Sequence, residues 1–172
     1  MGVINELLDT LGMGARSNKY MVNINGLGKK FEVGKMGDTL AKSTTIPGRS
    51  FNEVSIWNQG RLTTIAGDPD YSGTWSVTFR DTEEHKLRTI FIEWMEFIGT
   101  VQRNAREANS HNDYMTTSQV SQLSTVDNSV TATYEFYDIW PKSISDSSLS
   151  DDAQDMLEFT VEFNFSSWSK IC

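Results

Sequence analysis

The stretch TIAGDPDYSGTWSVTFRDTEEHKLRTIFIEWMEF, residues 64–97, decides the fold, because it contains a turn, a strand and a helix in direct succession. The turn is expected at residues 67–70, where Gly, Asp and Pro occur together. Over residues 75–79, large apolar side chains alternate with hydroxyl side chains. This period of two is typical of a strand with one buried face, so Trp75, Val77 and Phe79 are expected to point into a core.

The period changes directly after this strand. Asp81 or Thr82 is expected to cap a helix, with Glu84 three residues after Asp81 as in a capping box. Gly99 is expected to end the helix. Its apolar residues recur at steps of three and four, which places them on one face: Leu87, Ile90, Phe91, Trp94, Phe97 and Ile98. The strand and the helix are therefore predicted to pack their apolar faces together.

Length and charge restrict the class of protein. The chain has 172 residues, which suits a single domain over residues 1–172. Its net charge is −8, from 15 basic and 23 acidic residues, and this argues against nucleic-acid binding and against adhesion to an anionic membrane. Cys172 is the only cysteine, so no intramolecular disulfide is expected. No signal peptide or membrane span is expected either, which indicates folding in a cytoplasm.

Most of the remaining chain is predicted to form strands. Residues 20–24 and 30–33 are expected to pair as a hairpin, because Asn25-Gly26 tolerates the positive φ angles of a tight turn. Other segments with strand character are residues 61–66, residues 115–124, residues 130–140 before Pro141, and the strongly alternating residues 157–165. The expected fold is mainly β, a β-barrel or sandwich of about six to eight antiparallel strands with one flanking α-helix.

Other segments fit this sheet less well. Residues 3–12 have apolar side chains at helical spacing, and such a helix could dock on its own domain or on a neighbouring subunit. Residues 34–60 are mostly polar, with a turn at Pro47-Gly48, and residues 102–114 and 142–155 are also predicted to be loops. Long polar connections in a small domain are commonly functional.

Two short motifs resemble binding sites but lack an essential residue. Residues 68–73, DPDYSG, have oxygen ligands at calcium-loop spacing, yet Phe79 occupies the position of the required bidentate Glu. Residues 26–30, GLGKK, lack the first Gly and the final Ser or Thr of a phosphate-binding loop. The first is better interpreted as a turn, and the second is rejected as a phosphate site.

Catalytic candidates are equally weak. His85 lies beside Glu83 and Glu84, but neighbouring residues of a helix do not share a face, so a surface histidine is expected. The acidic residues of the Ser/Asp-rich segment fit a solvated loop better than a catalytic pair: Asp151, Asp152 and Asp155. The sequence therefore predicts no catalytic, cofactor-binding or metal-binding residue, and no enzyme.

Longer patterns carry a family resemblance. They are IPG at residues 46–48, GRLTTIAGD at 60–68, WSVTF at 75–79, EEH at 83–85 followed by FIEW at 91–94, ATYEFYDIWP at 132–141, and the alternating strand over 157–168. In this order and spacing they resemble the tail tube proteins of contractile-tailed bacteriophages, a T-even-like family related to the type six secretion tube protein. The resemblance covers residues 20–168 and rests on scaffold positions rather than catalytic ones.

The resemblance implies a structural virion protein whose copies form hexameric rings. The rings stack into a hollow tube inside a contractile sheath, and the inner strands of six subunits join into one barrel. The implied partners are further copies of the chain, the tail sheath protein, the tape-measure protein in the lumen, the baseplate hub and the tail terminator. DNA passes into the host without specific binding, no cofactor is implied, and the virion tail is assembled in the host bacterial cytoplasm.

Within this interpretation, residues 3–12 and 34–60 are the expected assembly elements. The polar strand 115–124 has two interpretations, because it could line a wet lumen or be an exposed edge strand. The nearest alternative function is the tube subunit of a contractile bacteriocin or of a type six secretion-like injection machine. A small-ligand-binding or hydrolytic β-barrel is a distant alternative, since it requires convergent polar groups around a pocket.

Overall fold

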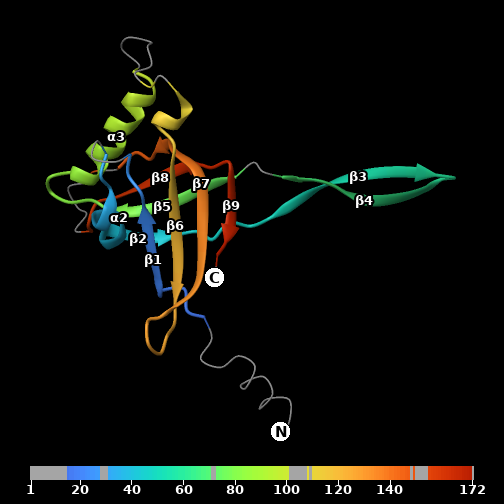
Figure 1. Cartoon of the computed structure of the whole chain (residues 1–172), viewed down its shortest axis with the longest axis horizontal. Coiled ribbons are helices and arrows are strands. Elements are labelled where there is room, and N and C mark those ends of the chain that lie inside the picture. Colours follow the sequence, from blue (N-terminus) through green and yellow to red (C-terminus); the bar gives the residue numbers. More distant parts are fainter. Residues whose placement is uncertain are drawn as a thin grey trace, which may run out of the picture.

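The computed structural model describes residues 15–27, 31–70, 73–100, 108, 110–147, 149 and 155–171. They form a body of crossed β-layers and a long two-stranded arm (Figure 1). In chain order the elements are β1 (Tyr20–Ile24), α2 (Gly34–Leu40), β2 (Ala41–Thr44), β3 (Ser50–Asn58), β4 (Arg61–Asp70), β5 (Thr74–Arg80), α3 (Lys86–Ile98), the 3-10 helix η1 (His111–Asp113), β6 (Thr116–Leu123), β7 (Val130–Ile144), β8 (Glu158–Asn164) and β9 (Ser167–Lys170). The predicted mainly β fold is confirmed.

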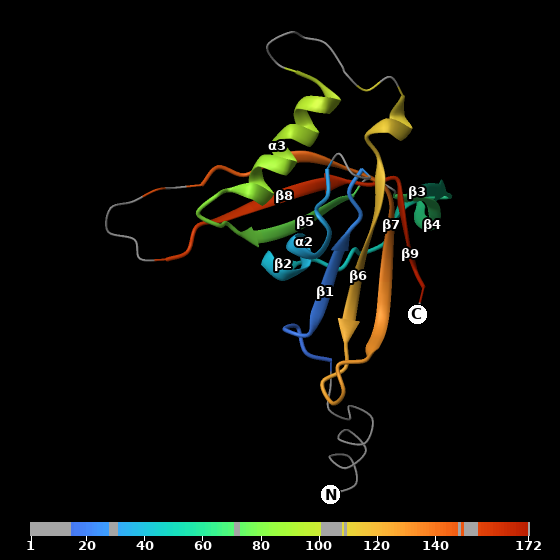
Figure 2. The same cartoon turned by 60° about the vertical axis from the view of Figure 1, so that its left-hand side comes forward.

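The strands of the body form one antiparallel sheet that folds over on itself. Its order is β1-β6-β7-β8-β5-β2, and β9 also pairs with β7. Figure 2 shows β1 and β6 running at a steep angle to β5 and β8, so the two parts of the sheet form crossed layers. Crossed layers of this kind need a strand that turns the corner from one layer to the other.

β7 is the strand that turns this corner. It pairs with β6 and β9 along its first part and with β8 along its second part. Between the two parts, Asp138 takes a φ of 55° where the register with β6 shifts, and such bulges bend a strand. The prediction that the strand ends before Pro141 is wrong, because Pro141 is buried opposite Phe163. Proline is tolerated there because the register shifts again between Pro141 and Ser143.

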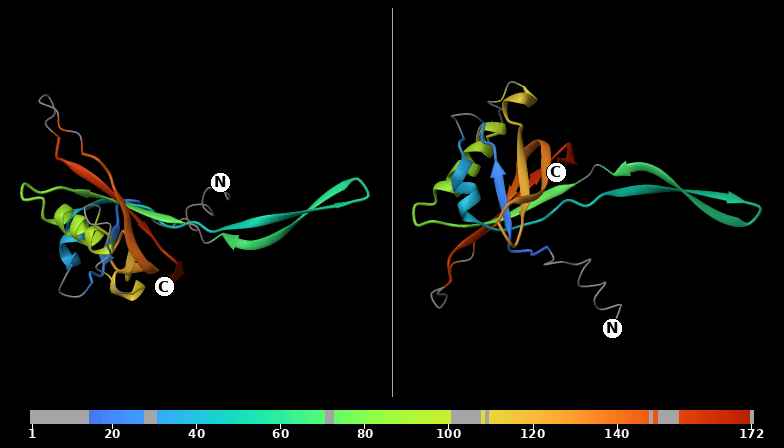
Figure 3. Two further views of the ribbon diagram at one scale, coloured as in Figure 1. Left: turned by 90° about the horizontal axis from the view of Figure 1, so that it is seen from above. Right: turned by 60° about the horizontal axis from the view of Figure 1, so that its bottom comes forward.

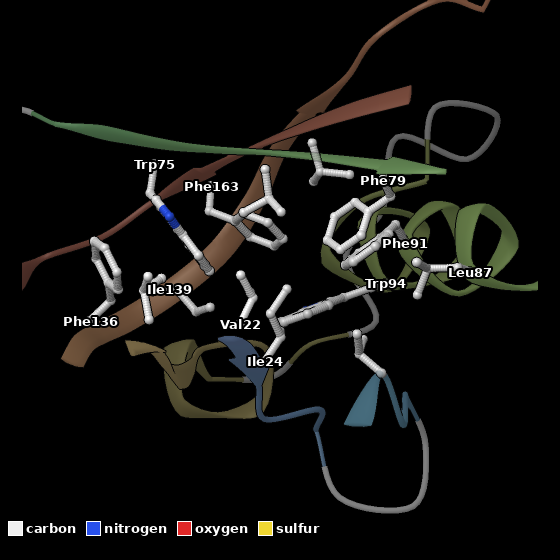
Figure 4. Packing of buried hydrophobic residues seen from close by; sticks show 14 of the residues in the cluster. Val22, Ile24, Trp75, Phe79, Leu87, Phe91, Trp94, Phe136, Ile139 and Phe163 are labelled. Carbon is white, nitrogen blue, oxygen red and sulfur yellow. The ribbon is translucent and has the colours of Figure 1, made fainter. Parts of the chain in front are cut away.

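The predicted buried face of β5 is confirmed. Trp75, Val77 and Phe79 are all buried, and their register partners on β8 are Phe163, Val161 and Phe159. The Trp75 and Phe163 ring centres lie 5.2 Å apart. Figure 4 shows side chains from β1, β5, β7 and α3 meeting in one apolar interior. The alternation seen in residues 75–79 and 157–165 therefore specifies the central pair of strands in the core.

Helix α3 covers this interior with the predicted apolar stripe. Leu87, Phe91 and Trp94 are buried, and the Phe91 ring centre lies 5.5 Å from that of Phe79 on β5. The Trp94 indole N–H donates to the Tyr114 carbonyl at 2.9 Å, so this buried ring is also satisfied as a donor. The C-terminal boundary at Gly99 is confirmed. The predicted packing of strand against helix is thus observed.

The predicted capping box at the start of α3 is wrong. The helix begins at Lys86 and its N-cap is His85, which has a φ of 49° and makes no side-chain cap hydrogen bond. The Asp81 carboxylate instead accepts from the Thr82 amide at 2.9 Å and contacts His85 Nδ1 at 2.7 Å. Glu84 lies in the turn before the helix rather than in its first turn, so the predicted capping box does not form.

The predicted hairpin of residues 20–24 and 30–33 is also wrong. β1 pairs with β6, and residues 31–33 form no strand, with Phe31 and Val33 buried. The Phe31 carbonyl approaches Gly26 so closely that a Cβ there would lie 1.7 Å from its oxygen. The Phe31 ring stacks at 6.4 Å from Trp94 of α3. Packing against the helix therefore outweighs the local turn preference of Asn25-Gly26.

Residues 34–60 are not the loop that was predicted. They contain α2, the short strand β2 on the edge beside β5, and all of β3. The strand predicted at 61–66 continues to Asp70, so the turn predicted at residues 67–70 does not form. β9, which follows the final alternating strand, was not predicted.

Some predictions lie partly or wholly outside the described residues. The N-terminal helix at 3–12 lies wholly outside them. In the loop predicted at 102–114, Ser110 caps the 3-10 helix by accepting from the Asn112 amide, while its own amide donates to Asp113. In the loop predicted at 142–155, residues 142–144 instead continue β7.

Candidate functional site

The arm, formed by β3 and β4, is the first candidate functional surface. Within the part of the chain that the structure describes, these two strands pair only with each other. All nine residues of β3 are exposed, and both views of Figure 3 show the arm extending away from the body. An isolated two-stranded hairpin is at best marginally stable in water. The described chain therefore gives the arm little support beyond its own strand pairing.

The sequence of the arm explains its local structure. Gln59 and Gly60 form the two-residue turn with φ angles of 49° and 77°, the combination found in type I′ hairpins. The flanking strands are rich in the β-branched residues that favour extended backbone: Val54, Ile56, Thr63, Thr64 and Ile65. Residues 50–60, the last part of the segment predicted as a polar loop, thus form one strand and the turn of a hairpin.

The root of the arm is tied to the body beside β9. The Arg49 guanidinium lies 4.5 Å from the centre of the Trp168 ring and donates to the Trp168 carbonyl at 3.4 Å. A hollow of about 320 Å³ lies at this junction, lined by Phe51 and Pro69 from the arm and by Phe165 and Trp168 from the body. The cation–π contact and the aromatic lining anchor the arm where it leaves the sheet.

The second candidate surface is the side of β6, β7 and β9 that points away from the core. Its residues alternate with the buried Val120 and Phe136 and face one another across the strands. We name this surface the polar face; it consists of Gln119, Ser121, Thr133, Glu135, Tyr137 and Ser169. Every one of these side chains has an uncharged hydrogen-bonding group except Glu135. The neighbouring strand β1 adds Asn23 and the more apolar Met21.

Hydrogen bonds link the polar face into a network. The Gln119 amide donates to Glu135 Oε1 at 3.0 Å, and the Tyr137 hydroxyl donates to Glu135 Oε2 at 2.7 Å. The Ser121 and Thr133 hydroxyls lie 3.1 Å apart, as do those of Tyr137 and Ser169. These partners keep the side chains aligned along the sheet, so the face is both polar and ordered.

Glu135 gives this face a fixed charge. The hydrogen bond from the Tyr137 hydroxyl, and then that from the Gln119 amide, lower the pKa of the Glu135 carboxyl. Both donors stabilise the ionised form, so the carboxylate stays negative to lower pH than an ordinary Glu. Each copy of the chain therefore presents one oriented negative charge on an otherwise neutral polar face.

The polar strand predicted at 115–124 is confirmed as β6, and its position excludes the edge-strand interpretation. β6 lies between β1 and β7. On the outer side of β1, the Val22 amide donates to Asp38 of α2 at 3.1 Å, and the Tyr20 hydroxyl reaches the Lys42 carbonyl. Burial raises the pKa of the Tyr20 hydroxyl, which keeps it a donor. The edge of β1 is thus partly covered within the subunit.

The rejected binding motifs do not come together as sites. Asp68 and Asp70 lie on the arm, and residues 71–72 of the calcium-like motif are outside the described residues, as are Asp151 and Asp152. Asp155 is exposed.

Across the described residues, no group of three His, Cys, Asp or Glu side chains is placed to hold a metal. The same residues include no helix that is both long and apolar enough to cross a membrane.

The pairing of His85 with Asp81 is a contact that sequence reasoning missed. His85 is exposed, as predicted, but its Nδ1 lies 2.7 Å from the carboxylate of buried Asp81. Their i,i+4 spacing was the available signal, but Asp81 was assigned to helix capping with Glu84 instead. Asp81 and His85 line a separate hollow that also includes Ser147. The Ser147 hydroxyl donates to the Glu158 carbonyl and accepts from Arg88, so His85 does not activate it.

Comparison with known proteins gives a family and a set of similar folds. The family described as "Phage tail tube protein" matches residues 15–171 of the chain. The sheath/tube terminator of the PVC extracellular contractile injection system, in its extended state, has a TM-score of 0.66 at 11% identity and covers 91% of this chain and 96% of its own. The PVC sheath-tube complex in its extended state has a TM-score of 0.63 at 11% identity, and the match covers 96% of this chain and 95% of that one. The tube-terminating cap of the anti-feeding prophage has a TM-score of 0.64 at 11% identity, and the match covers 91% of this chain and 89% of that one.

At 11% identity these matches show similarity of fold alone, and that similarity extends over nearly the whole length of each chain. No curated protein matches the chain in sequence.

Proposed function

The chain belongs to the phage tail tube protein family, and we propose that its copies form stacked hexameric rings that make the tail tube. Its role is structural, as a component of the virion tail. The observation that carries the proposal of assembly is the arm, which exposes apolar side chains and has no partner strand within the described chain. An exposed apolar patch on a soluble subunit marks an interaction surface.

The arm replaces the wider segment 34–60 as the main assembly element in this proposal. α2 and β2 belong to the body, whereas residues 50–70 project from it. The segment 3–12 remains a second proposed assembly element on the strength of its amphipathic sequence. Removal of residues 1–12 is expected to leave the domain folded and to weaken stacking of the rings.

We assign the polar face to the lumen of the tube. A conduit for DNA needs a wetted wall that does not hold phosphates, and neutral hydroxyl and amide groups with one carboxylate meet this need. A ring of Glu135 carboxylates, one from each subunit, repels the phosphate backbone weakly and evenly. DNA then passes through without specific binding, and the tape-measure protein occupies the same space before DNA is released.

Further partners follow from the relatives. The similar structures are those of a sheath-tube complex, a sheath/tube terminator and a baseplate. We propose the corresponding partners for this chain: the sheath protein around the tube, the baseplate hub at one end and the tail terminator at the other, with assembly in the host bacterial cytoplasm. Neither membrane anchoring nor a catalytic activity forms part of this proposal, and it needs no cofactor.

A tube subunit of a contractile bacteriocin or injection machine is the second candidate function. The solved structures that resemble the chain come from an extracellular contractile injection system and an anti-feeding prophage. Neighbouring genes distinguish the two, since capsid and terminase genes indicate a phage. The distant alternative of a ligand-binding or hydrolytic barrel is disfavoured, because Trp75, Phe136 and Phe163 fill the space between the crossed layers.

Electron microscopy of the purified protein, alone and with the tail initiator complex, tests the proposal. Rings or hollow tubes with sixfold symmetry are expected. A species that remains monomeric at high concentration in both conditions would count against a tube subunit.

A further inference from the structure

The four-stranded layer that carries the polar face has two open edges. Its strands lie in the order β1, β6, β7 and β9, and within the described chain β1 and β9 each pair with one strand only (Figure 1). Adjacent strands are antiparallel, so β1 and β9 run in opposite directions. An open edge needs protection in a soluble protein, because its unpaired backbone groups can pair with another chain.

Asp38 protects the edge of β1. The Leu123 amide of β6 donates to the Lys19 carbonyl at 2.9 Å, so the odd-numbered residues of this segment direct their backbone groups to β6. The even-numbered Val22 therefore directs its amide outward, and this amide donates to Asp38 Oδ1 of α2 at 3.1 Å. The carboxylate occupies the place that the carbonyl of a further strand would take.

Arg49 protects the edge of β9 in the complementary way. The Ile171 amide donates to the Thr133 carbonyl of β7 at 2.9 Å, so the odd-numbered residues of this segment face β7. The even-numbered Trp168 directs its carbonyl outward, and this carbonyl accepts from the Arg49 guanidinium at 3.4 Å. One edge thus presents a covered donor and the other a covered acceptor.

We infer that Asp38 and Arg49 close the two edges in the free subunit and exchange partners when copies meet in a ring. β9 of one copy then lies antiparallel beside β1 of the next, and the Val22 amide donates to the Trp168 carbonyl across the junction. The released carboxylate and guanidinium, which belong to different copies, form an ion pair at the same junction. This inference rests on the proposed ring of copies.

The exchange leaves no group without a partner. Each junction loses an amide–carboxylate and a guanidinium–carbonyl hydrogen bond, and it gains a backbone hydrogen bond and an ion pair. Asp38 and Arg49 are both exposed, so they can leave the edges without moving a buried charge. Neither takes part in the ion pairs found among the described residues. Opposite charges on the two edges also attract one copy to the next, which favours this junction over contact between two like edges.

Disulfide trapping in assembled tubes tests the pairing. With Val22 opposite Trp168, Met21 of one copy lies opposite Ser169 of the next as a non-hydrogen-bonded pair, with Cα atoms about 4.5 Å apart. Met21→Cys combined with Ser169→Cys, in a Cys172→Ser background, is expected to give disulfide-linked species of up to six copies on a non-reducing gel. Within one copy the two positions lie on opposite edges of the layer and are too far apart to bond.

Asn23→Cys combined with Ser169→Cys is the matched control. A register shifted by two residues would bring this pair together, so it is expected to stay unlinked. Linkage of the control pair, or no linkage of the Met21 and Ser169 pair in intact tubes, overturns the inference while the tube proposal stands. Absence of rings or tubes for the wild type, with or without the initiator complex, overturns both.

Charge reversal tests the ion pair. Asp38→Arg and Arg49→Asp each place like charges at the junction, and each is expected to raise the protein concentration needed for tube formation by about tenfold or more. The double variant restores opposite charges and should assemble at a concentration no higher than the wild type. It should also assemble with a shorter lag, because arginine cannot accept from the Val22 amide and aspartate cannot donate to the Trp168 carbonyl. A double variant as impaired as the single variants overturns the inference.

Hydrogen exchange in the free subunit tests the protection itself. Asp38→Ala is expected to raise the exchange rate of the Val22 amide by about fivefold or more, since this amide loses its acceptor. The Asn23 amide, which faces β6, is the internal control and should keep its rate. An unchanged Val22 rate would show that Asp38 does not protect the edge and would overturn the inference.

Discussion

The body and the arm use the same kinds of side chain for opposite purposes. Trp94 in the body is fully buried, stacks with Phe31 and donates its indole N–H to the Tyr114 carbonyl. Trp57 in the arm exposes 71% of its surface. Apolar side chains in the body hold crossed layers and a helix together, whereas those of the arm are left for contacts with other molecules. Exposure in the subunit, rather than residue type, therefore separates folding residues from assembly residues.

Replacing Trp94 should have the largest effect on the body. Trp94→Ala is expected to lower the free energy of unfolding by about 3–5 kcal/mol, because it leaves a cavity beneath α3 and removes a satisfied indole. Chemical denaturation of the purified monomer measures this change. A free energy of unfolding near that of the wild type would show that the helix face is not part of the core.

Changes in the arm turn should have a smaller and local effect. Gly60→Ala places a Cβ at a φ of 77° and is expected to destabilise the paired arm by about 1–2 kcal/mol without changing the unfolding of the body. Hydrogen exchange measured residue by residue distinguishes the two regions. Gln59→Asn is the matched control and should protect the arm amides better, because Asn tolerates the positive φ of this position. A lower midpoint for the whole body would show that the two regions fold together.

Trp57→Ala should change the free energy of unfolding of the monomer by no more than about 0.5 kcal/mol, since an exposed side chain contributes little to folding. Thermal unfolding and electron microscopy of the same sample check this contrast with Trp94→Ala. A loss of monomer stability as large as that of Trp94→Ala would mean that the arm packs on its own body.

The polar face should show a pH effect that the arm lacks. The pKa of Glu135 is lowered in the folded state, so its contribution to stability is present above its unfolded pKa and is lost as the pH falls through the folded pKa. Tyr137→Phe removes the first of its two donors and should raise the pH at which Glu135 titrates, as followed by NMR of the side-chain carboxyl. Asp127 is the internal control, because its lowered pKa comes from Ser129 and Ser124 and should not change. An unchanged Glu135 titration would contradict the role of Tyr137.

Sequence patterns predicted those parts of the fold that depend on periodicity within one segment. The buried faces of β5, α3 and β8 are where the alternation and the helical spacing place them. The partner of β1 was predicted incorrectly because it is a distant strand, β6. The start of α3 was predicted incorrectly because Asp81 contacts His85 instead of capping the helix. The hairpin nature of residues 50–70 was also missed, since Gln59-Gly60 is a weaker turn signal than Asn-Gly.

The sequence by itself determines the local alternation of apolar and polar residues. It also shows the absence of an enzyme signature and the resemblance to tail tube proteins, because these are properties of neighbouring residues and their order. Tertiary structure alone decides that β7 turns a corner at Asp138, that Gln119, Glu135 and Tyr137 meet on one polar face, and that residues 50–70 leave the body as an arm. The reason is physical: periodicity determines which side of a segment is apolar, but only long-range packing determines whether that side is buried by its own chain.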